Sequence, residues 1–219
     1  MKIDILTLFP EMFRGPFDES IVKRAQNKKL VEIKIHNLRQ WTEDKHQTVD
    51  DRPFGGGTGM ILMIEPLVKA VEDLKTPDSK IILLSPRGTV WKQRLAKKYS
   101  SPKHLILICG HYEGVDERIS NFVDEEISIG DFILTGGEIP TMVLIDSIVR
   151  LIPEVLEKQE ATQKESFEPL LEFPQYTRPE TFRGLKVPKI LLSGNHQKIA
   201  EWRRKKAEEL TKKLRPDLI

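Results

Sequence analysis

Alternation of apolar and polar positions is the clearest pattern in the first part of the chain. Apolar residues occupy every second position in residues 2–9 and again in 31–38, the spacing of β-strands. Between them, the apolar spacing of 18–29 predicts a helix. Three further runs are short and mainly apolar, as expected for strands buried in a parallel sheet: 81–85, 104–109 and 125–129.

Helical spacing separates these apolar runs. Residues 90–99 and 115–123 both show it, and a longer helix is predicted over 138–152. Pro140 suits the first turn of that helix, and Pro153 stops it. The alternation of strands and helices predicts an α/β domain with a mainly parallel sheet.

The character of the sequence changes after this domain, which we place at residues 1–153. Residues 154–168 are polar, charged and nearly without large apolar side chains, so they are predicted to form a flexible linker. The remainder, 169–219, begins with an irregular stretch rich in proline and glycine. It closes with an amphipathic helix that places these residues near one face: Ile199, Trp202, Lys206, Leu210 and Leu214.

Composition restricts the class of protein. Hydrophobic residues make up 39% of the chain and charged residues 31%, which describes an ordinary globular protein. The longest apolar runs are too short to span a bilayer, and the N-terminus lacks a signal-peptide core, so no membrane association is expected. The single cysteine, Cys109, excludes an internal disulfide and suits the cytoplasm. Its place at the end of an apolar run predicts a buried, inert thiol.

The net charge of +2 is unevenly spread. Residues 195–219 hold eight Lys or Arg against four acids, so this tail is +4 and the rest of the chain is −2. A basic end on a near-neutral body favours a polyanionic partner. A solvated helix face explains the same charges equally well.

Glycine-rich loops carry the candidate chemistry. Loops at 85–88, 109–114 and 129–137 follow the three apolar runs, and ligands of open α/β sheets bind beyond the carboxyl ends of the strands. None matches a dinucleotide-binding or P-loop motif. The pattern predicts a small-molecule site made of backbone loops, although glycines that only make turns remain the alternative. Residues 50–60 form a further glycine-rich loop, either a lid or a plain connection, and the scattered histidines predict no structural metal site.

Several segments together resemble one family. They are DDRPFGGGTGM, LSPRG, CGHYEGVDERI, SIGDFILTGGEIP, LIDSIVRLIP, PQYTRPETFRGL, VPKILLSGNH and IAEWRR, in family order across nearly the whole chain. The family is the bacterial tRNA (guanine-37-N1)-methyltransferase of the SPOUT class, the TrmD family. The resemblance implies a deep trefoil knot in the N-terminal α/β domain. It also implies a homodimer in which each active site is built across the subunit boundary.

The resemblance implies that the α/β domain binds S-adenosyl-L-methionine in a bent shape. Backbone groups would hydrogen-bond the adenine while apolar side chains sandwich it. The cofactor-binding residues implied by position are Leu84, Ser85, Pro86, Gly110, Glu113, Ile129, Gly130, Asp131, Phe132, Ile133, Leu134, Gly136, Gly137 and Pro140.

The resemblance also assigns the catalytic roles. Guanine N1 carries a proton near neutral pH, so a base must remove it, and a cation steadies the charge that develops on O6. Glu165 occupies the position of the base and Arg150 that of the cation. Two residues depart from the family: Glu165 replaces an aspartate, and His111 stands where an arginine is usual. The basic C-terminal domain would then grip the anticodon stem and loop of tRNA.

Two alternatives remain open at this point. A non-catalytic RNA-binding module is disfavoured by the intact cofactor loops together with Arg150 and Glu165. The same knotted scaffold acting on a ribose of another RNA is disfavoured by Glu165, since ribose methylation takes no proton from guanine N1. A requirement for Mg²⁺ is not addressed by the sequence.

Overall fold

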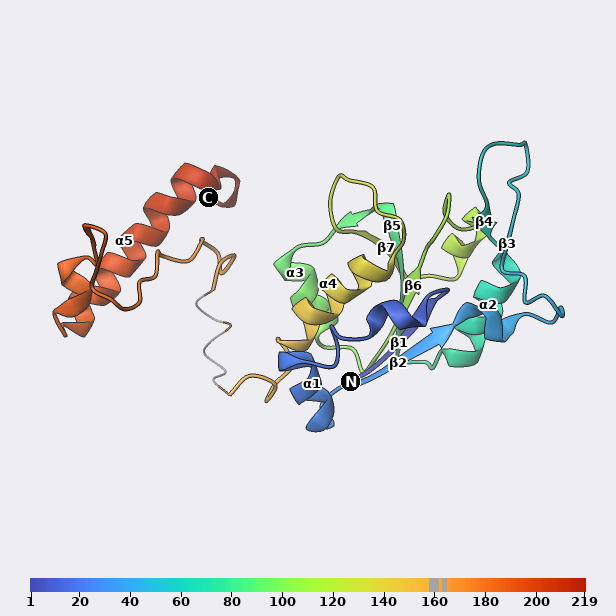
Figure 1. Ribbon diagram of the computed structural model, residues 1–219, viewed down its shortest axis with the longest axis horizontal. Coiled ribbons are helices and arrows are strands. Elements are labelled where there is room, and N and C mark those ends of the chain that lie inside the picture. The colour runs from blue at the N-terminus through green and yellow to red at the C-terminus, as the bar shows by residue number, and fades with distance from the viewer. Residues whose placement is uncertain (158–161, 163–164) are drawn as a thin grey trace. The chain divides into compact units, whose positions relative to one another are not determined.

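A computed structural model describes residues 1–157, 162 and 165–219. The chain divides into two compact units, Met1–Glu157 and Lys158–Ile219 (Figure 1). The division falls within residues 154–168, the segment predicted as a linker.

A five-stranded parallel sheet forms the centre of the first unit. Its strand order is β2-β1-β6-β5-β7, and every adjacent pair is parallel, as the sequence predicts. The strands are β1 (Lys2–Thr7), β2 (Glu32–Asn37), β5 (Ser79–Val90), β6 (His104–Cys109) and β7 (Glu125–Ser128). A separate antiparallel pair comprises β3 (Asp50–Asp51) and β4 (Ile61–Leu62).

Both faces of the sheet are covered. Successive side chains of β6 alternate between two hydrophobic clusters, so that Leu105 and Leu107 belong to one and Ile106 and Ile108 to the other. The first cluster packs under α1 (Ser20–Asn27), α3 (Gln93–Tyr99) and α4 (Glu138–Val149), and the short η1 (Pro10–Phe13) joins it. The second packs under α2 (Ile64–Leu74), η2 (Leu38–Trp41) and η3 (Glu117–Asn121) (Figure 1). Helices on both faces explain why β6 and the first part of β5 read as continuous apolar runs.

A buried carboxylate joins three strands of this sheet. Asp4 of β1 is 0% exposed, and its oxygens lie 2.7 Å from His36 Nε2, 2.6 Å from His104 Nε2 and 2.6 Å from Lys2 Nζ. Ser79 Oγ lies 2.7 Å from His104 Nδ1 and extends the network to β5. Burial raises the pKa of Asp4, but the hydrogen bonds from His36, Lys2 and His104 outweigh it and hold this pKa well below its usual range.

Two predicted helices differ in extent from the observed ones. The helix predicted over 138–152 ends at Val149, because Leu151 and Ile152 close tighter turns with N–H bonds to Ile148 O (2.9 Å) and Val149 O (3.1 Å). The helical spacing of 115–123 produces only the 3₁₀ helix η3, where Asp116 accepts a hydrogen bond from Arg118 N.

The strand predicted over 81–85 is longer than expected. β5 runs to Val90, and it pairs with β7 as far as Leu84 and again from Thr89. The predicted loop 85–88 is therefore an irregularity inside an extended strand. Gly88 permits it, since a Cβ at this position would collide with the backbone of Glu126 and Ile127.

The second unit is built around one long helix. α5 (His196–Leu214) is capped at its N-terminus by Asn195, whose side chain accepts a hydrogen bond from Lys198 N. It is accompanied by a hairpin of β8 (Thr181–Phe182) and β9 (Leu185–Lys186), by η5 (Lys189–Leu192) and by η6 (Pro216–Leu218). The hairpin lies within the stretch predicted to be irregular. None of the described helices is long and apolar enough to cross a membrane.

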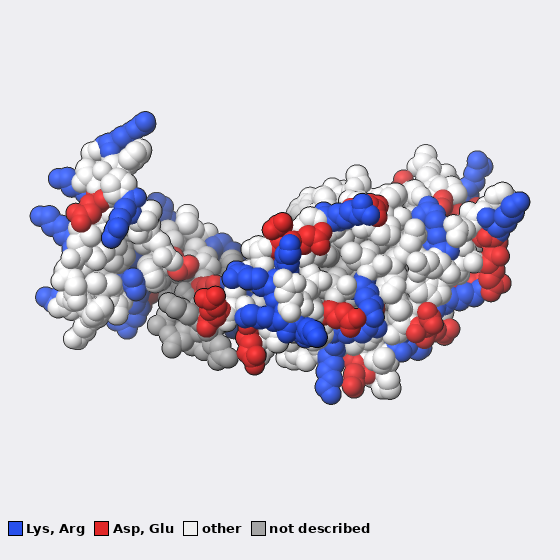
Figure 2. All heavy atoms as spheres, turned by 60° about the horizontal axis from the view of Figure 1, so that its bottom comes forward, with Lys and Arg blue, Asp and Glu red and all other residues white. Residues whose placement is uncertain are grey.

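One side of α5 packs within its own unit. Ala207 and Thr211 are buried, Trp202 contacts the ring of Tyr176, and Thr211 Oγ1 accepts a hydrogen bond from Leu171 N at 2.9 Å. Leu214, predicted on the packing face, is 57% exposed. Lysine and arginine side chains project from this unit (Figure 2).

The ends of the segment predicted as a linker are ordered by contacts. Val155 is buried in the first unit, and Ser166 Oγ accepts a hydrogen bond from Glu172 N in the second. Phe167 N donates to Leu170 O at 2.8 Å. The middle of the prediction, 158–161 and 163–164, lies outside the described residues.

Candidate active site

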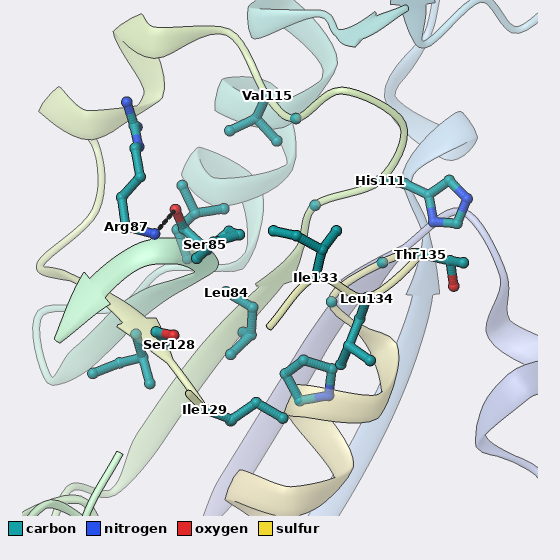
Figure 3. A pocket seen from close by; sticks show the side chains of 18 of the residues that line it. Leu84, Ser85, Arg87, His111, Val115, Ser128, Ile129, Ile133, Leu134 and Thr135 are labelled. Atoms are coloured by element: carbon teal, nitrogen blue, oxygen red, sulfur yellow. Dashed lines mark hydrogen bonds between the residues drawn. The ribbon is translucent and has the colours of Figure 1, made fainter. Parts of the chain in front are cut away.

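A pocket of about 490 Å³ lies in the first unit, where β5, β6 and β7 end and α4 begins. This volume is within the range of small-molecule sites. Leu84 comes from β5, while Ile133 and Leu134 come from the loop that precedes α4 (Figure 3). The side chain of Ile133 is 82% exposed, so the pocket presents an apolar surface to solvent.

The pocket loops are joined by a close backbone contact. Gly137 N donates a 2.7 Å hydrogen bond to Gly110 O, which fixes the start of α4 against the end of β6. A Cβ on Gly137 would lie 2.7 Å from Cys109 Cα and 3.0 Å from Gly110 N. Glycine is needed here because only a residue without a side chain lets the two backbones approach so closely.

The glycine-rich loop 50–60 is anchored to the pocket at its C-terminal end. Glu113 N donates to Met60 O at 3.1 Å, and Leu62 N donates to Gly114 O at 3.0 Å. A Cβ on Gly59 would collide with the side chain of Glu113. Phe54, near the middle of the loop, is fully exposed.

The residues that the resemblance assigns to the cofactor come together, with one exception. All of them line the pocket except Asp131, which is exposed in the same loop. The pocket also has lining residues that the sequence analysis did not assign: Leu83, Arg87, His111, Tyr112, Gly114, Val115, Glu117, Ile127, Ser128 and Thr135. Most of these are direct neighbours of assigned residues. The sequence could therefore indicate which loops form the pocket, but not which positions of each loop line it.

Charged side chains form one wall of the pocket. Arg87 Nη1 lies 2.8 Å from Glu117 Oε2, and Arg87 Nη2 lies 3.4 Å from Glu126 Oε1. The hydrogen bond with Glu117 and the negative charge of Glu126 raise the pKa of Arg87, which stays charged. Ser85 and Arg87 lie together on β5 (Figure 3).

Behind the pocket, Cys109 is buried, as predicted. Burial raises the pKa of its thiol, and the negative charge of Glu138 raises it further. Its sulfur lies 3.2 Å from Thr141 Oγ1. The thiol therefore remains neutral and unreactive.

The two residues assigned to catalysis do not line this pocket. Arg150 follows the last residue of α4, at the opposite end of the helix from Pro140. Ten residues separate the two, which corresponds to about 15 Å along a helix. Glu165 belongs to the second unit, directly before Ser166. Among the described residues, no cluster of His, Cys, Asp and Glu has the composition of a metal site.

Comparison with known proteins covers the whole chain. A family model described as tRNA (Guanine-1)-methyltransferase TrmD matches residues 1–219. A tRNA (guanine-N(1)-)-methyltransferase of Dictyoglomus turgidum is 59% identical over 220 residues, which cover 100% of this chain and 90% of the relative. The enzyme of the same name from Carboxydothermus hydrogenoformans is 54% identical over 221 residues, covering 100% and 87%. The chain belongs to the tRNA (guanine-1)-methyltransferase TrmD family.

Proposed function

We propose that this protein transfers the methyl group of S-adenosyl-L-methionine to N1 of guanosine at position 37 of tRNA, next to the anticodon. Methyl transfer to guanine N1 of tRNA follows from the family and its relatives. The observation that supports the methyl donor is that the predicted cofactor loops come together around one pocket.

The pocket suits S-adenosyl-L-methionine in size and in chemistry. Leu84, Ile129 and Leu134 offer apolar surface for the adenine. Glu113 also lines the pocket, and its carboxylate favours a ligand that carries a sulfonium and an ammonium group. The bound donor supplies an electrophilic methyl group.

We further propose that Glu165 accepts the proton of guanine N1 and that the Arg150 guanidinium stabilises the negative charge that develops on O6. A carboxylate is suited to the first role because it accepts hydrogen bonds only, and arginine to the second because it keeps its charge at all working pH values.

The position of Arg150 supports an active site shared between two subunits. Within one chain, α4 separates Arg150 from the pocket residue Pro140 by about 15 Å along its axis, too far for both to contact one reacting base. A homodimer supplies the arginine from a second copy. Exposed apolar residues of α4, Ile139 (47%) and Val143 (43%), are suited to such an interface.

The remaining proposals follow from the same family. The first unit has the deep trefoil knot of the SPOUT class, and residues 1–153, 154–168 and 169–219 serve as the cofactor domain, the linker with the base and the tRNA-binding domain. The protein works in the cytoplasm. The basic side chains of the C-terminal unit contact the tRNA backbone (Figure 2).

The test is methyl transfer from labelled S-adenosyl-L-methionine to two tRNA transcripts that differ only at position 37. Labelling is expected with guanosine there and not with adenosine. Equal labelling of both transcripts refutes the substrate assignment.

The base is tested separately with Glu165→Gln. We expect turnover to fall by about 10²- to 10⁴-fold, the usual contribution of a general base, with unchanged affinity for the methyl donor. The matched control, Glu165→Asp, retains the carboxylate and much of the activity. Full turnover by Glu165→Gln excludes Glu165 as the base.

A further inference from the structure

Two buried polar atoms face each other beside the pocket. Glu138 Oε2 and His111 Nδ1 lie 3.8 Å apart, and neither has a hydrogen-bond partner within the described part of the chain. A separation of 3.8 Å is too long for a hydrogen bond. Buried polar atoms without partners are costly, so such a pair calls for an explanation.

The Glu138 carboxylate is held in place by the fold. Glu138 is the first residue of α4 and is 1% exposed. Its other oxygen, Oε1, accepts a 2.7 Å hydrogen bond from Thr7 Oγ1 of β1. The helix N-terminus favours a negative charge at this position. One carboxylate oxygen is therefore occupied and the second is directed at His111.

The imidazole is also held on two sides. The Phe9 ring lies 4.6 Å from that of His111, and the Tyr112 ring packs edge-on at 5.0 Å. His111 lines the pocket at some distance from Leu84 and Ile129 (Figure 3). Two other titratable groups lie next to the pair: the Tyr112 phenol, whose ring packs on the imidazole, and the Cys109 thiol, which stays neutral because burial and Glu138 raise its pKa. The carboxylate that His111 Nδ1 faces is that of Glu138.

The pair is linked to the pocket through its backbone. His111 and Gly136 form an isolated antiparallel bridge, next to the hydrogen bond from Gly137 N to Gly110 O. Gly136 lies between the two side chains, since a Cβ there would meet His111 Nδ1 at 2.5 Å. A change in the separation of His111 from Glu138 would therefore act directly on the contact between two pocket-lining loops.

We propose that His111 and Glu138 are a positioning pair, and that protonation of His111 closes them into an ion pair that draws the 110–114 loop onto α4 and strengthens binding of the methyl donor. The inference rests on the proposed donor site. A charged N–H···O bond is about 2.8 Å long, so closure moves the groups together by about 1 Å. Imidazole is suited to this role because its charge changes near neutral pH.

The test is calorimetric titration of the full-length protein with S-adenosylhomocysteine, the demethylated donor, at about pH 6 and about pH 8. We expect about tenfold tighter binding at the lower pH, equal to about 1.4 kcal/mol. Titrations in buffers of different ionisation enthalpy should show proton uptake on binding near neutral pH. By linkage, uptake means that the ligand favours the protonated protein.

Three variants assign the effect to the pair. His111→Gln and Glu138→Gln should bind with the weaker affinity at both pH values and take up no proton there. His111→Arg, which is charged throughout, should bind independently of pH and restore the tighter affinity. A merely structural role for His111 predicts that both His111 variants lose affinity alike.

Failure of this inference is distinguishable from failure of the proposed donor. Wild-type binding that is equal at both pH values without proton uptake, or a pH dependence that persists in His111→Gln, overturns the positioning pair but leaves the donor site intact. No binding of S-adenosylhomocysteine at either pH by the folded wild type overturns both.

Discussion

Replacing Gly137 with alanine tests how closely the pocket loops must pack. The backbone of Gly137 (φ −82°, ψ −2°) is open to any residue, so the effect of a methyl group is steric. The added Cβ would lie 2.7 Å from Cys109 Cα, whereas carbon atoms pack at about 3.5 Å or more. The loop must therefore move by about 1 Å.

The expected cost follows from two contributions. Overpacking against rigid backbone costs about 1–3 kcal/mol. Weakening the 2.7 Å bond from Gly137 N to Gly110 O adds about 1 kcal/mol. We expect Gly137→Ala to lower the free energy of unfolding of the first unit by about 2–4 kcal/mol and to weaken binding of S-adenosylhomocysteine.

Urea denaturation followed by tryptophan fluorescence measures this cost. A Trp202→Phe background leaves Trp41 and Trp91, both in the first unit, as the reporters. Gly110→Ala is the matched control, because its Cβ would meet its nearest neighbour, Leu84 O, at an ordinary 3.5 Å. An unfolding midpoint for Gly137→Ala equal to that of the control would refute the steric argument.

Three further predictions concern charge. Asp4→Asn should lower the free energy of unfolding by about 3 kcal/mol at neutral pH. Because the pKa of Asp4 is depressed in the folded protein, the difference in unfolding free energy between wild type and variant should shrink as the pH falls below about 4. Urea unfolding at several pH values measures this difference, and a difference that does not change with pH contradicts the prediction. Cys109 should resist alkylation by iodoacetamide at about pH 8 in the native protein and react in denaturant, because burial raises the pKa of its thiol. Mass spectrometry detects the adduct, and rapid labelling of the native protein would disprove the prediction. The double variant Lys212→Glu and Lys213→Glu on α5 should weaken tRNA binding and reduce the dependence of log affinity on log salt concentration by about 2. Filter binding at several salt concentrations measures this slope, and an unchanged slope excludes these lysines from the contact with tRNA.

The sequence predicted the parts of the fold that depend on local periodicity. Apolar alternation located β1 and β2, and a continuous apolar run located β6, because successive side chains of a strand point to opposite faces and both faces of β6 are buried. The extension of β5 through 85–88 was missed, because proline and glycine there read as a turn and only the approach of β7 explains the pairing. The end of α4 was predicted too late in the sequence. Pro153 prevents the helix from continuing further, but the helix already ends at Val149.

The sequence predicted which loops form the candidate site, but not which side chains contact each other within it. The assigned loops do share one pocket, yet spacing alone did not indicate that His111 and Glu138 would face each other across 27 positions, or that Asp4 would bind His104, 100 positions away. Such pairs arise from the way strands, loops and helices come together in the folded unit, and no local pattern encodes them. The roles of Glu165 and Arg150 remain predictions.

The helix α4 places a limit on how this chain can vary. It carries the pocket residue Pro140 in its first turn and is followed directly by Arg150, while Leu144, Ile145 and Ile148 between them are fully buried. Exchanging one buried aliphatic residue for another of similar volume is well tolerated. One inserted residue, however, rotates everything after it by about 100° around the axis. With Arg150 in its proposed role, the helix is a spacer of fixed length, and we expect insertions in relatives to fall outside it.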